Sequence, residues 1–124
     1  MRRSMLFIPG NTPNLLINGN CLGADAVIFD LEDAVAPDQK DAARVLVRNT
    51  LRYTRPQGCT VIVRINATDS PYWQQDLAAL IPYKPDIILP PKVFSADSVR
   101  LIDEEITMLE EKHGMEVGSV GLLP

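Results

Sequence analysis

Short apolar runs along this chain alternate with longer segments in which apolar residues recur every three or four positions. The runs at 3–8, 26–30, 60–63, 87–89 and 119–123 are rich in branched or aromatic side chains and predict strands. The segments at 12–23, 37–53, 72–81 and 95–113 have helical spacing and predict helices. The run 26–30 is apolar without alternation, which is typical of a parallel strand that is buried on both faces.

Helix boundaries are marked by residues that favour the first or last turn. Thr12 and Ser95 are candidate N-caps, and Pro37 can open its helix because its missing N–H needs no partner there. Gly23 is a candidate C-cap. His113 is the only histidine, and its position at a helix C-terminus favours a surface role that complements the helix dipole over a catalytic one.

The alternation of strand and helix with short connections predicts right-handed βαβ units around a parallel sheet, with residues 1–124 as a single α/β segment. Two architectures begin in this way. One is a TIM (β/α)8 barrel of about 250 residues, and the other is an open doubly wound sheet. The length of 124 residues alone favours the open sheet.

Polar side chains follow each of the first four predicted strands. They are Asn11, then Asp30, Glu32 and Asp33, then Arg64 and Asn66, and finally Lys92. Because these loops all lie at one face of a parallel sheet, we expect the side chains to converge on one site. Carboxylates crowded in one loop repel one another and favour a nearby metal ion, arginine or lysine. Capping of the following helix by one or two of them explains their presence equally well.

Arg64 has two interpretations. Its planar guanidinium can bind a carboxylate through two parallel hydrogen bonds. It can equally form a structural ion pair with Asp30 or Glu32, since ion-pair networks also occur at the ends of sheets. Lys92 can steady a carboxylate or phosphate, although a lysine at the end of a strand is more often solvated.

Composition narrows the classes of function. The chain is 46% hydrophobic and 23% charged with a formal net charge of −4, and its basic residues are scattered, which argues against nucleic-acid binding. No apolar run approaches the roughly 20 residues of a membrane span, and the one before Pro9 is too short for a signal peptide. Cys21 and Cys59 are too few and too far apart for a disulfide framework or a zinc site, so we expect buried thiols and a cytoplasmic location.

Four blocks of sequence, in order, carry a resemblance that covers the whole chain. The blocks are RSMLFIPGN at 3–11, GADAVIFDLEDAV at 23–35, VRIN at 63–66 with Asp69, Ser70 and Tyr72, and LPPKV at 89–93. Together they resemble the citrate lyase β-subunit family, which includes malyl-CoA and citramalyl-CoA lyases within the wider group of HpcH/HpaI aldolases. The resemblance implies the first half of a TIM barrel, (β/α)4 plus the fifth strand.

The resemblance also implies a magnesium-dependent retro-Claisen cleavage of a 3-hydroxy-3-carboxy acyl thioester, carried on coenzyme A or an acyl-carrier pantetheine. By resemblance Arg64 clamps the substrate carboxylate, with Asp30 and Glu32 as further catalytic residues. Asp30, Glu32 and Asp33 would hold metal-bound waters. The implied substrate-binding residues are Arg64, Asn66, Lys92 and the mouth residues Pro9, Gly10 and Asn11.

The resemblance stops before the direct metal ligands, which in this family are a glutamate after the fifth strand and an aspartate after the sixth. We therefore expect no direct metal ligand in this chain, which would be a truncated reading frame, a split gene product or a fragment. A half barrel leaves strand edges and apolar surface uncovered, so we expect the chain alone to be a homo-oligomer or else poorly ordered. Other lyase subunits or an acyl carrier protein are further implied partners.

Two other functions stay open. One is a non-catalytic accessory chain that binds an acyl thioester or pairs with an intact lyase subunit. The other is phosphoaspartate chemistry, because residues 27–35 approach the aspartate motif of haloacid-dehalogenase phosphatases, although Glu32 stands where they need a second aspartate. Response-regulator receivers resemble the chain more faintly.

Overall fold

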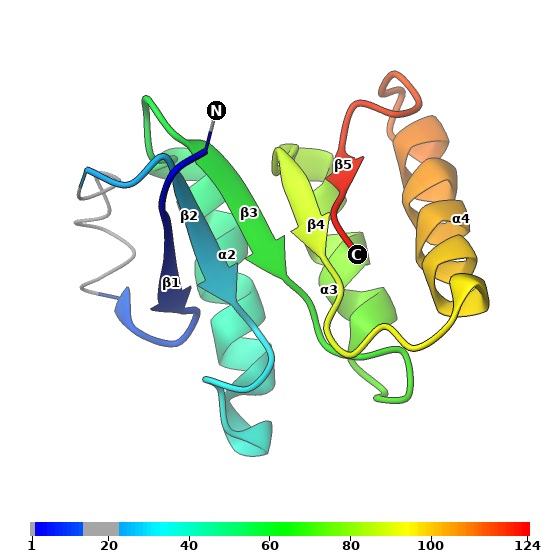
Figure 1. Cartoon of the computed structure of the whole chain (residues 1–124), viewed down its shortest axis with the longest axis horizontal. Helices are drawn as coiled ribbons and strands as arrows, with labels where there is room; N and C mark the ends of the chain where they lie inside the picture. The colour runs from blue at the N-terminus through cyan, green and yellow to red at the C-terminus, as the bar shows by residue number, and fades with distance from the viewer. Residues whose placement is uncertain (1, 14–22) are drawn as a thin grey trace.

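The strands of this protein form one parallel sheet in the order of the sequence. The computed structural model describes residues 2–13 and 23–124. The strands are β1 (Met5–Pro9), β2 (Ala26–Asp30), β3 (Thr60–Arg64), β4 (Ile87–Leu89) and β5 (Gly121–Leu122), paired in the order β1-β2-β3-β4-β5 (Figure 1). The helices are α2 (Lys40–Tyr53), α3 (Trp73–Leu80) and α4 (Ala96–Lys112), with short 3₁₀ turns η1 (Pro37–Gln39) and η2 (Ile81–Tyr83). The predicted helix at 12–23 lies mostly outside the described residues.

The helices α2, α3 and α4 share one core with the sheet. In Figure 1, α2 and α3 lie behind the strands and α4 lies beside β5. Alternate strand residues such as Val27 and Phe29 form this main core with apolar residues of the helices. The intervening residues Ala26, Ile28 and Ile62 form a smaller cluster on the other face. The uninterrupted apolar run in β2 is therefore explained, because all of its residues are buried.

The order of the strands decides between the two predicted architectures. A right-handed connection that always steps to the next strand on the same side places every helix on one face of the sheet. A doubly wound sheet reverses its order partway and covers both faces. The sequential order and the single helical layer match the wound pattern of a TIM barrel, so this chain forms part of such a fold. The open doubly wound sheet that the length alone favoured is wrong.

The observed ends of the helices and strands lie close to those predicted from the sequence. Ser95 caps α4 by accepting a hydrogen bond from the Ser98 amide, and His113 follows its last turn as predicted. Pro37 begins a 3₁₀ turn, and the α-helix proper starts at Lys40. The last strand is shorter than the predicted 119–123, because only Gly121–Leu122 pairs with β4.

Cys59 corrects one prediction. The structure has it disulfide-bonded, which contradicts the expectation of a thiol there, and Cys21 lies outside the described residues. The cytoplasmic location rested on reduced thiols, so it stays a prediction without that support. No helix in the described part of the chain is long and apolar enough to cross a membrane.

Candidate active site at the carboxyl ends of the strands

Asp30 and Arg64 form a two-point ion pair at the carboxyl ends of β2 and β3. The parallel register sets them side by side, and both project from the face without helices. Arg64 Nε lies 2.8 Å from Asp30 Oδ1, and Arg64 Nη2 lies 2.6 Å from Asp30 Oδ2. The Asp30 carboxylate also accepts the backbone N–H groups of Glu32 and Ala34 at 2.9 and 3.0 Å. Both of its oxygens are therefore engaged, and Asp30 is buried.

The hydrogen bonds to Asp30 decide its protonation. Burial acts to raise the pKa of Asp30, but hydrogen bonds from Arg64 and from the amides of Glu32 and Ala34 outweigh it, so the pKa lies below its usual value. The same pairing raises the pKa of Arg64, although burial opposes it. Asp30 is thus a fixed anion that orients Arg64. A buried carboxylate with both oxygens occupied is poorly placed to accept a phosphoryl group, which argues against phosphoaspartate chemistry.

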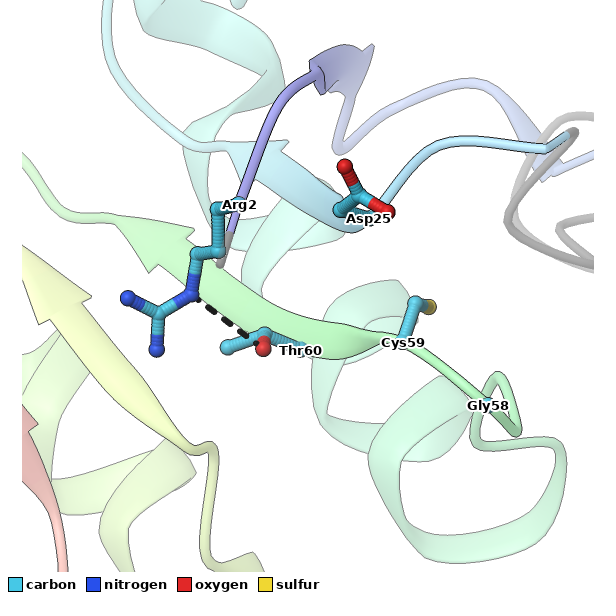
Figure 2. Close-up of a pocket in the computed structure, with 5 residues that line it drawn as sticks. All are labelled: Arg2, Asp25, Gly58, Cys59 and Thr60. Carbon is cyan, nitrogen blue, oxygen red and sulfur yellow. Dashed lines mark hydrogen bonds between the residues drawn. The ribbon is translucent and has the colours of Figure 1, made fainter.

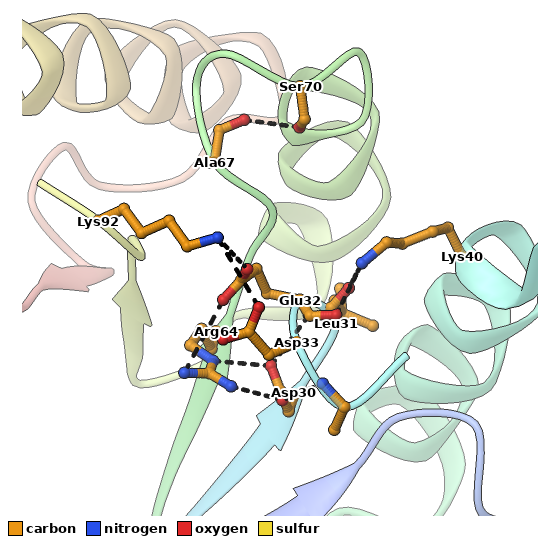
Figure 3. A network of polar contacts seen from close by, with 10 residues as sticks. Asp30, Leu31, Glu32, Asp33, Lys40, Arg64, Ala67, Ser70 and Lys92 are labelled. Atoms are coloured by element: carbon orange, nitrogen blue, oxygen red, sulfur yellow. Dashed lines mark hydrogen bonds and ion pairs between the residues drawn. The ribbon is translucent and has the colours of Figure 1, made fainter. Parts of the chain in front are cut away.

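Lys92 joins the cluster from the loop after β4 (Figure 3). Its Nζ lies 3.2 Å from Glu32 Oε2 and 3.8 Å from Asp33 Oδ1. Its backbone has φ 51°, a left-handed conformation that costs a residue with a side chain about 1–2 kcal/mol. The geometry therefore places the ammonium against the acidic loop at the expense of backbone strain.

The pKa values of Glu32 and Asp33 are shifted in opposite directions. Burial and a hydrogen bond with Asp33 raise the pKa of Glu32, against the opposing effect of Lys92. The hydrogen bond with Glu32 lowers the pKa of Asp33, whose side chain is well exposed. Glu32 is therefore the carboxyl in this loop that most readily holds a proton.

The acidic loop is supported from beneath by Lys40 and Gly10. Lys40 Nζ donates to the carbonyls of Leu31 and Glu32 at 3.0 and 2.7 Å (Figure 3). Gly10 donates its N–H to the Asp30 carbonyl at 2.8 Å, and a Cβ at this position would lie 2.9 Å from that oxygen. Only glycine fits so close to the end of β2. The turn Pro9, Gly10 and Asn11 thus reaches the same rim as the acidic loop.

Arg64 keeps one nitrogen clear of Asp30. Its Nη1 lies 3.9 Å from Glu32 Oε1, which is longer than a hydrogen bond. The guanidinium carbon lies 5.0 Å from the centre of the Phe7 ring, so the aromatic face supports the cation from β1. Arg64 is thus held on two sides while Nη1 faces the space beside Glu32.

The structure brings together most of the residues that the sequence singled out. Asp30, Glu32, Asp33, Arg64 and Lys92 form one connected network (Figure 3). The structural interpretation of Arg64 is seen directly, because one edge of its guanidinium pairs with Asp30 and Nη1 forms a looser ion pair with Glu32 at 3.9 Å. Asn66 differs from the expectation: it is buried, and its amide nitrogen donates to Asp76 Oδ2 at 2.7 Å.

Sequence reasoning missed two buried carboxylates and the role of Arg44. Asp76 accepts hydrogen bonds from Asn66 and Arg44, and Glu110 accepts the backbone N–H groups of Gly118 and Val120. Helical spacing contained the signal. Asp76 falls within the apolar face that begins at Trp73, so its side chain had to be buried.

Hollows lie at both ends of the sheet in the described part of the chain. One of about 210 Å³ adjoins Lys92 and is lined by Ala67, Thr68, Asp69, Phe94 and Ser98. The other, of about 610 Å³, lies at the opposite end of the sheet beside Arg2 and Thr60, whose side chains are hydrogen-bonded at 3.3 Å (Figure 2). Ligands of parallel α/β folds bind beyond the carboxyl ends of the strands, so the larger hollow is not the candidate site.

The described residues fit a metal ion only in part. Among them no group of three or more His, Cys, Asp or Glu side chains is arranged to hold one. Glu32 and Asp33 can accept hydrogen bonds from metal-bound water. A complete set of direct ligands would need groups from elsewhere.

The chain is similar in sequence to citrate lyase beta subunits and to malyl-CoA thioesterases. The family model described as HpcH/HpaI aldolase/citrate lyase matches residues 3–124. Citrate lyase subunit beta of Escherichia coli (strain K12) is 42% identical over 122 residues, which cover 98% of this chain and 40% of that protein. The (3S)-malyl-CoA thioesterase of Cereibacter sphaeroides (strain ATCC 17025 / ATH 2.4.3) is 44% identical over 120 residues, 91% of this chain and 42% of that protein. The chain thus spans about 40% of the length of these relatives.

Solved structures agree with this assignment. The citrate lyase beta subunit of Mycobacterium tuberculosis complexed with oxaloacetate and magnesium has a TM-score of 0.68 and 36% identity, covering 79% of this chain and 42% of that chain. CitE of the same organism in complex with magnesium, acetoacetate and coenzyme A has a TM-score of 0.66 and 33% identity, covering 82% and 38%. The malate synthase of Haloferax volcanii has a TM-score of 0.84 at 20% identity, covering 98% and 41%, and shares the fold. Because the family model matches nearly the whole chain, this protein belongs to the HpcH/HpaI aldolase/citrate lyase family.

Proposed function

We propose that this chain provides the carboxylate-binding part of the active site of a magnesium-dependent carbon–carbon lyase that acts on a 3-hydroxy-3-carboxy acyl thioester. The position of Arg64 carries this proposal. Asp30 holds the Nε and Nη2 edge of the guanidinium, and Nη1 lies beyond hydrogen-bond distance of Glu32. A substrate carboxylate at this rim would meet a donor whose direction is already fixed, which reduces the entropic cost of binding.

The proposed reaction breaks the bond between the carbinol carbon and the α-carbon of the thioester. The electron pair of that bond passes to the α-carbon as a thioester enolate, which takes up a proton to give an acyl thioester. The carbinol hydroxyl loses its proton and becomes the carbonyl of a 2-oxo acid. The carboxylate beside that carbon is unchanged, so Arg64 can hold the same group from substrate to product.

The other residues of the rim have supporting roles in this proposal. Asp30 orients Arg64, and Glu32 with Asp33 accepts hydrogen bonds from metal-bound water. Lys92 balances the charge of the acidic loop and can contact an anionic substrate, while Pro9, Gly10 and Asn11 border the path of the acyl carrier. Mg²⁺ would act as a Lewis acid on the substrate oxygens, with direct ligands from outside the described residues.

The substrate is proposed to be of the citryl or citramalyl type, carried on coenzyme A or on the pantetheine of an acyl carrier protein. Two relatives support this choice. The M. tuberculosis citrate lyase beta subunit was solved with oxaloacetate and magnesium, and CitE with magnesium, acetoacetate and coenzyme A. A lyase that releases oxaloacetate or pyruvate would need the segment beyond β5, supplied by the same polypeptide or by another, because the chain spans about 40% of its relatives.

A titration with oxaloacetate in the presence of Mg²⁺ tests the carboxylate site. Arg64→Lys keeps the charge and loses the fork, so we expect the dissociation constant to rise at least tenfold. Arg100→Lys is the matched control, because Arg100 pairs with Asp97 on the exposed surface of α4. Equal affinities for the wild type and Arg64→Lys, or no binding by the wild type, would contradict the proposal.

One observation favours a second candidate, a non-catalytic accessory chain that binds an acyl thioester. The described residues hold no cluster of three metal-ligating side chains. Mixing this chain with the separately expressed C-terminal segment of a relative separates the two functions. If the mixture releases oxaloacetate or pyruvate from a citryl or citramalyl thioester and neither segment does so by itself, the result supports a lyase. If the mixture binds the thioester without releasing a product, the result supports the accessory chain.

A further inference from the structure

Asp76 is a fully buried carboxylate that no part of the proposed reaction uses. It lies in the first turn of α3 and has an exposed fraction of 0%. Its Oδ2 accepts the backbone N–H of Asn66 at 3.0 Å and the Asn66 Nδ2 group at 2.7 Å. Its Oδ1 accepts Arg44 Nε at 2.9 Å. One side chain therefore joins α2 and α3 to the segment that follows β3.

The segment from Arg64 to Asn66 is held in place at each residue. The Arg64 carbonyl accepts the Leu31 N–H at 2.9 Å, and Ile65 donates its N–H to the Leu89 carbonyl at 3.2 Å. At Asn66 the N–H donates to Asp76 instead of to a neighbouring strand. Asp76 thus continues the backbone anchoring of β3 by one residue past the last strand contact, two residues beyond Arg64.

Arg44 fixes Asp76 in turn. Its Nη1 is paired with Asp41 at 2.9 Å, and 11% of its side chain is exposed. Within the described residues, Arg44 Nη2 is buried without a hydrogen-bond partner. Arg44 thus holds Asp76 Oδ1 from α2, while its own position is fixed by the pair with Asp41.

We propose that Asp76 is a positioning residue, which sets the place of Arg64 at the carboxylate site by anchoring the backbone at Asn66. Asn66 acts here through its backbone N–H and its bond to Asp76. The ligand in this inference rests on the proposed function, because it takes the carboxylate of a 2-oxo acid as the partner of Arg64.

The test compares two buried carboxylates that tie loops to helices. Asp76→Asn replaces an acceptor oxygen with an amide that faces the donors of Asn66 and Arg44. Glu110→Gln is the matched control, because Glu110 is 1% exposed and accepts the N–H groups of Gly118 and Val120 in the loop before β5. For both we would record the Arg64 Nε–Hε resonance by ¹⁵N NMR, the affinity for oxaloacetate with Mg²⁺, and the melting temperature.

We expect Asp76→Asn to move the Arg64 resonance and to weaken oxaloacetate binding at least tenfold at a temperature where the variant is folded. Glu110→Gln should lower the melting temperature while leaving the resonance in place and the affinity within twofold. An unchanged resonance in Asp76→Asn, or equal shifts in both variants, would overturn the inference and leave Asp76 as a structural residue.

A third variant keeps the test decisive if Asp76→Asn does not fold. Asp76→Glu keeps the negative charge at this buried position but displaces the carboxylate by one methylene from the Asn66 N–H, so it should move the Arg64 resonance. No movement would overturn the inference. Failure of the wild type to bind oxaloacetate counts against the proposed function alone, because the resonance is measured without ligand.

Discussion

Several buried carboxylates of this chain accept hydrogen bonds from backbone N–H groups, and some of them also bind an arginine. Asp30 accepts two backbone N–H groups and the Arg64 guanidinium, so it fixes both a loop and a cation. Asp76 and Glu110 likewise accept backbone N–H groups that lie outside helices and strands. A buried anion is tolerated only when it is fully hydrogen-bonded, so these contacts explain why acids occupy interior positions.

Asp30→Asn is expected to lower the free energy of unfolding by about 2–3 kcal/mol at pH 7, because it breaks a buried charge-assisted pair. The pKa of folded Asp30 is held below its usual 3.8, so its contribution is fully present above about pH 4 and is lost as the pH falls through the lower folded value. The cost of the substitution should therefore be smaller at pH 3 than at pH 7. Urea unfolding at the two pH values measures it.

The control for this prediction is Asp97→Asn. Asp97 forms an exposed pair with Arg100, and its replacement should change the free energy of unfolding by less than about 0.5 kcal/mol at either pH. Equal costs for Asp30→Asn at pH 3 and pH 7 would show that the carboxylate does not stabilise the fold through its charge.

The sequence predicted which side chains meet at the ends of the strands, but it did not predict the hydrogen-bond partner of each side chain. The rule that loops after parallel strands share one face brought Arg64, Lys92 and the acidic loop together correctly. The same rule assigned Asn66 to the site, but Asp76 takes its amide from the side of α3. Sequence spacing gives the face on which a residue lies, whereas the partner of a hydrogen bond depends on how neighbouring helices pack.

Helix α4 shows how far local signals determine an element. Ser95 has extended backbone angles, φ −149° and ψ 154°, and its side chain accepts the Ser98 N–H at 3.3 Å. The apolar residues of α4 recur at helical spacing, and Ile102, Ile106 and Leu109 among them are buried. The cap and the spacing are both local, so the helix could be predicted from its own residues.

Ser95→Ala is expected to destabilise the protein by about 1 kcal/mol, because one N–H of the first turn loses its acceptor. For a chain of this size the melting temperature should fall by roughly 3–5 °C. Ser95→Asp keeps an acceptor at the cap and should change the melting temperature little. Thermal unfolding followed by circular dichroism checks both variants, and equal losses would show that the cap is not the source of the effect.

The sheet was less predictable than the helices, since strand order is a property of pairing between distant segments. β5 was predicted over 119–123, but only Gly121–Leu122 pairs with β4, which is itself limited to Ile87–Leu89. In the sequence, length alone favoured an open sheet and the family resemblance implied half of a barrel; the strand order in the structure agrees with the barrel. Strand order is the better criterion, because it records which side each crossover took.

In the described part of the chain, the two faces of the sheet are covered differently. Helices α2, α3 and α4 pack on one side, whereas on the other side Ile28 and Ile62 are buried at the centre and Met5 and Phe7 of β1 are 47% and 51% exposed. Among the described strands, β1 and β5 each pair on one side alone. A closed barrel has no such edges, so the two edges and the exposed side chains of β1 are where a further chain segment or a second copy would add to this sheet.

The 124-residue chain, expressed alone, is therefore expected to self-associate through this surface. Light scattering coupled to size-exclusion chromatography should give a mass above the 13.7 kDa of one chain. Met5→Lys places a charge on the exposed side of β1 and should shift the population toward the monomer. Leu101→Lys is the matched control, because Leu101 is also 47% exposed but lies on α4, on the helical side. A monodisperse wild-type monomer, or equal dissociation by both variants, would show that the exposed side of β1 does not drive assembly.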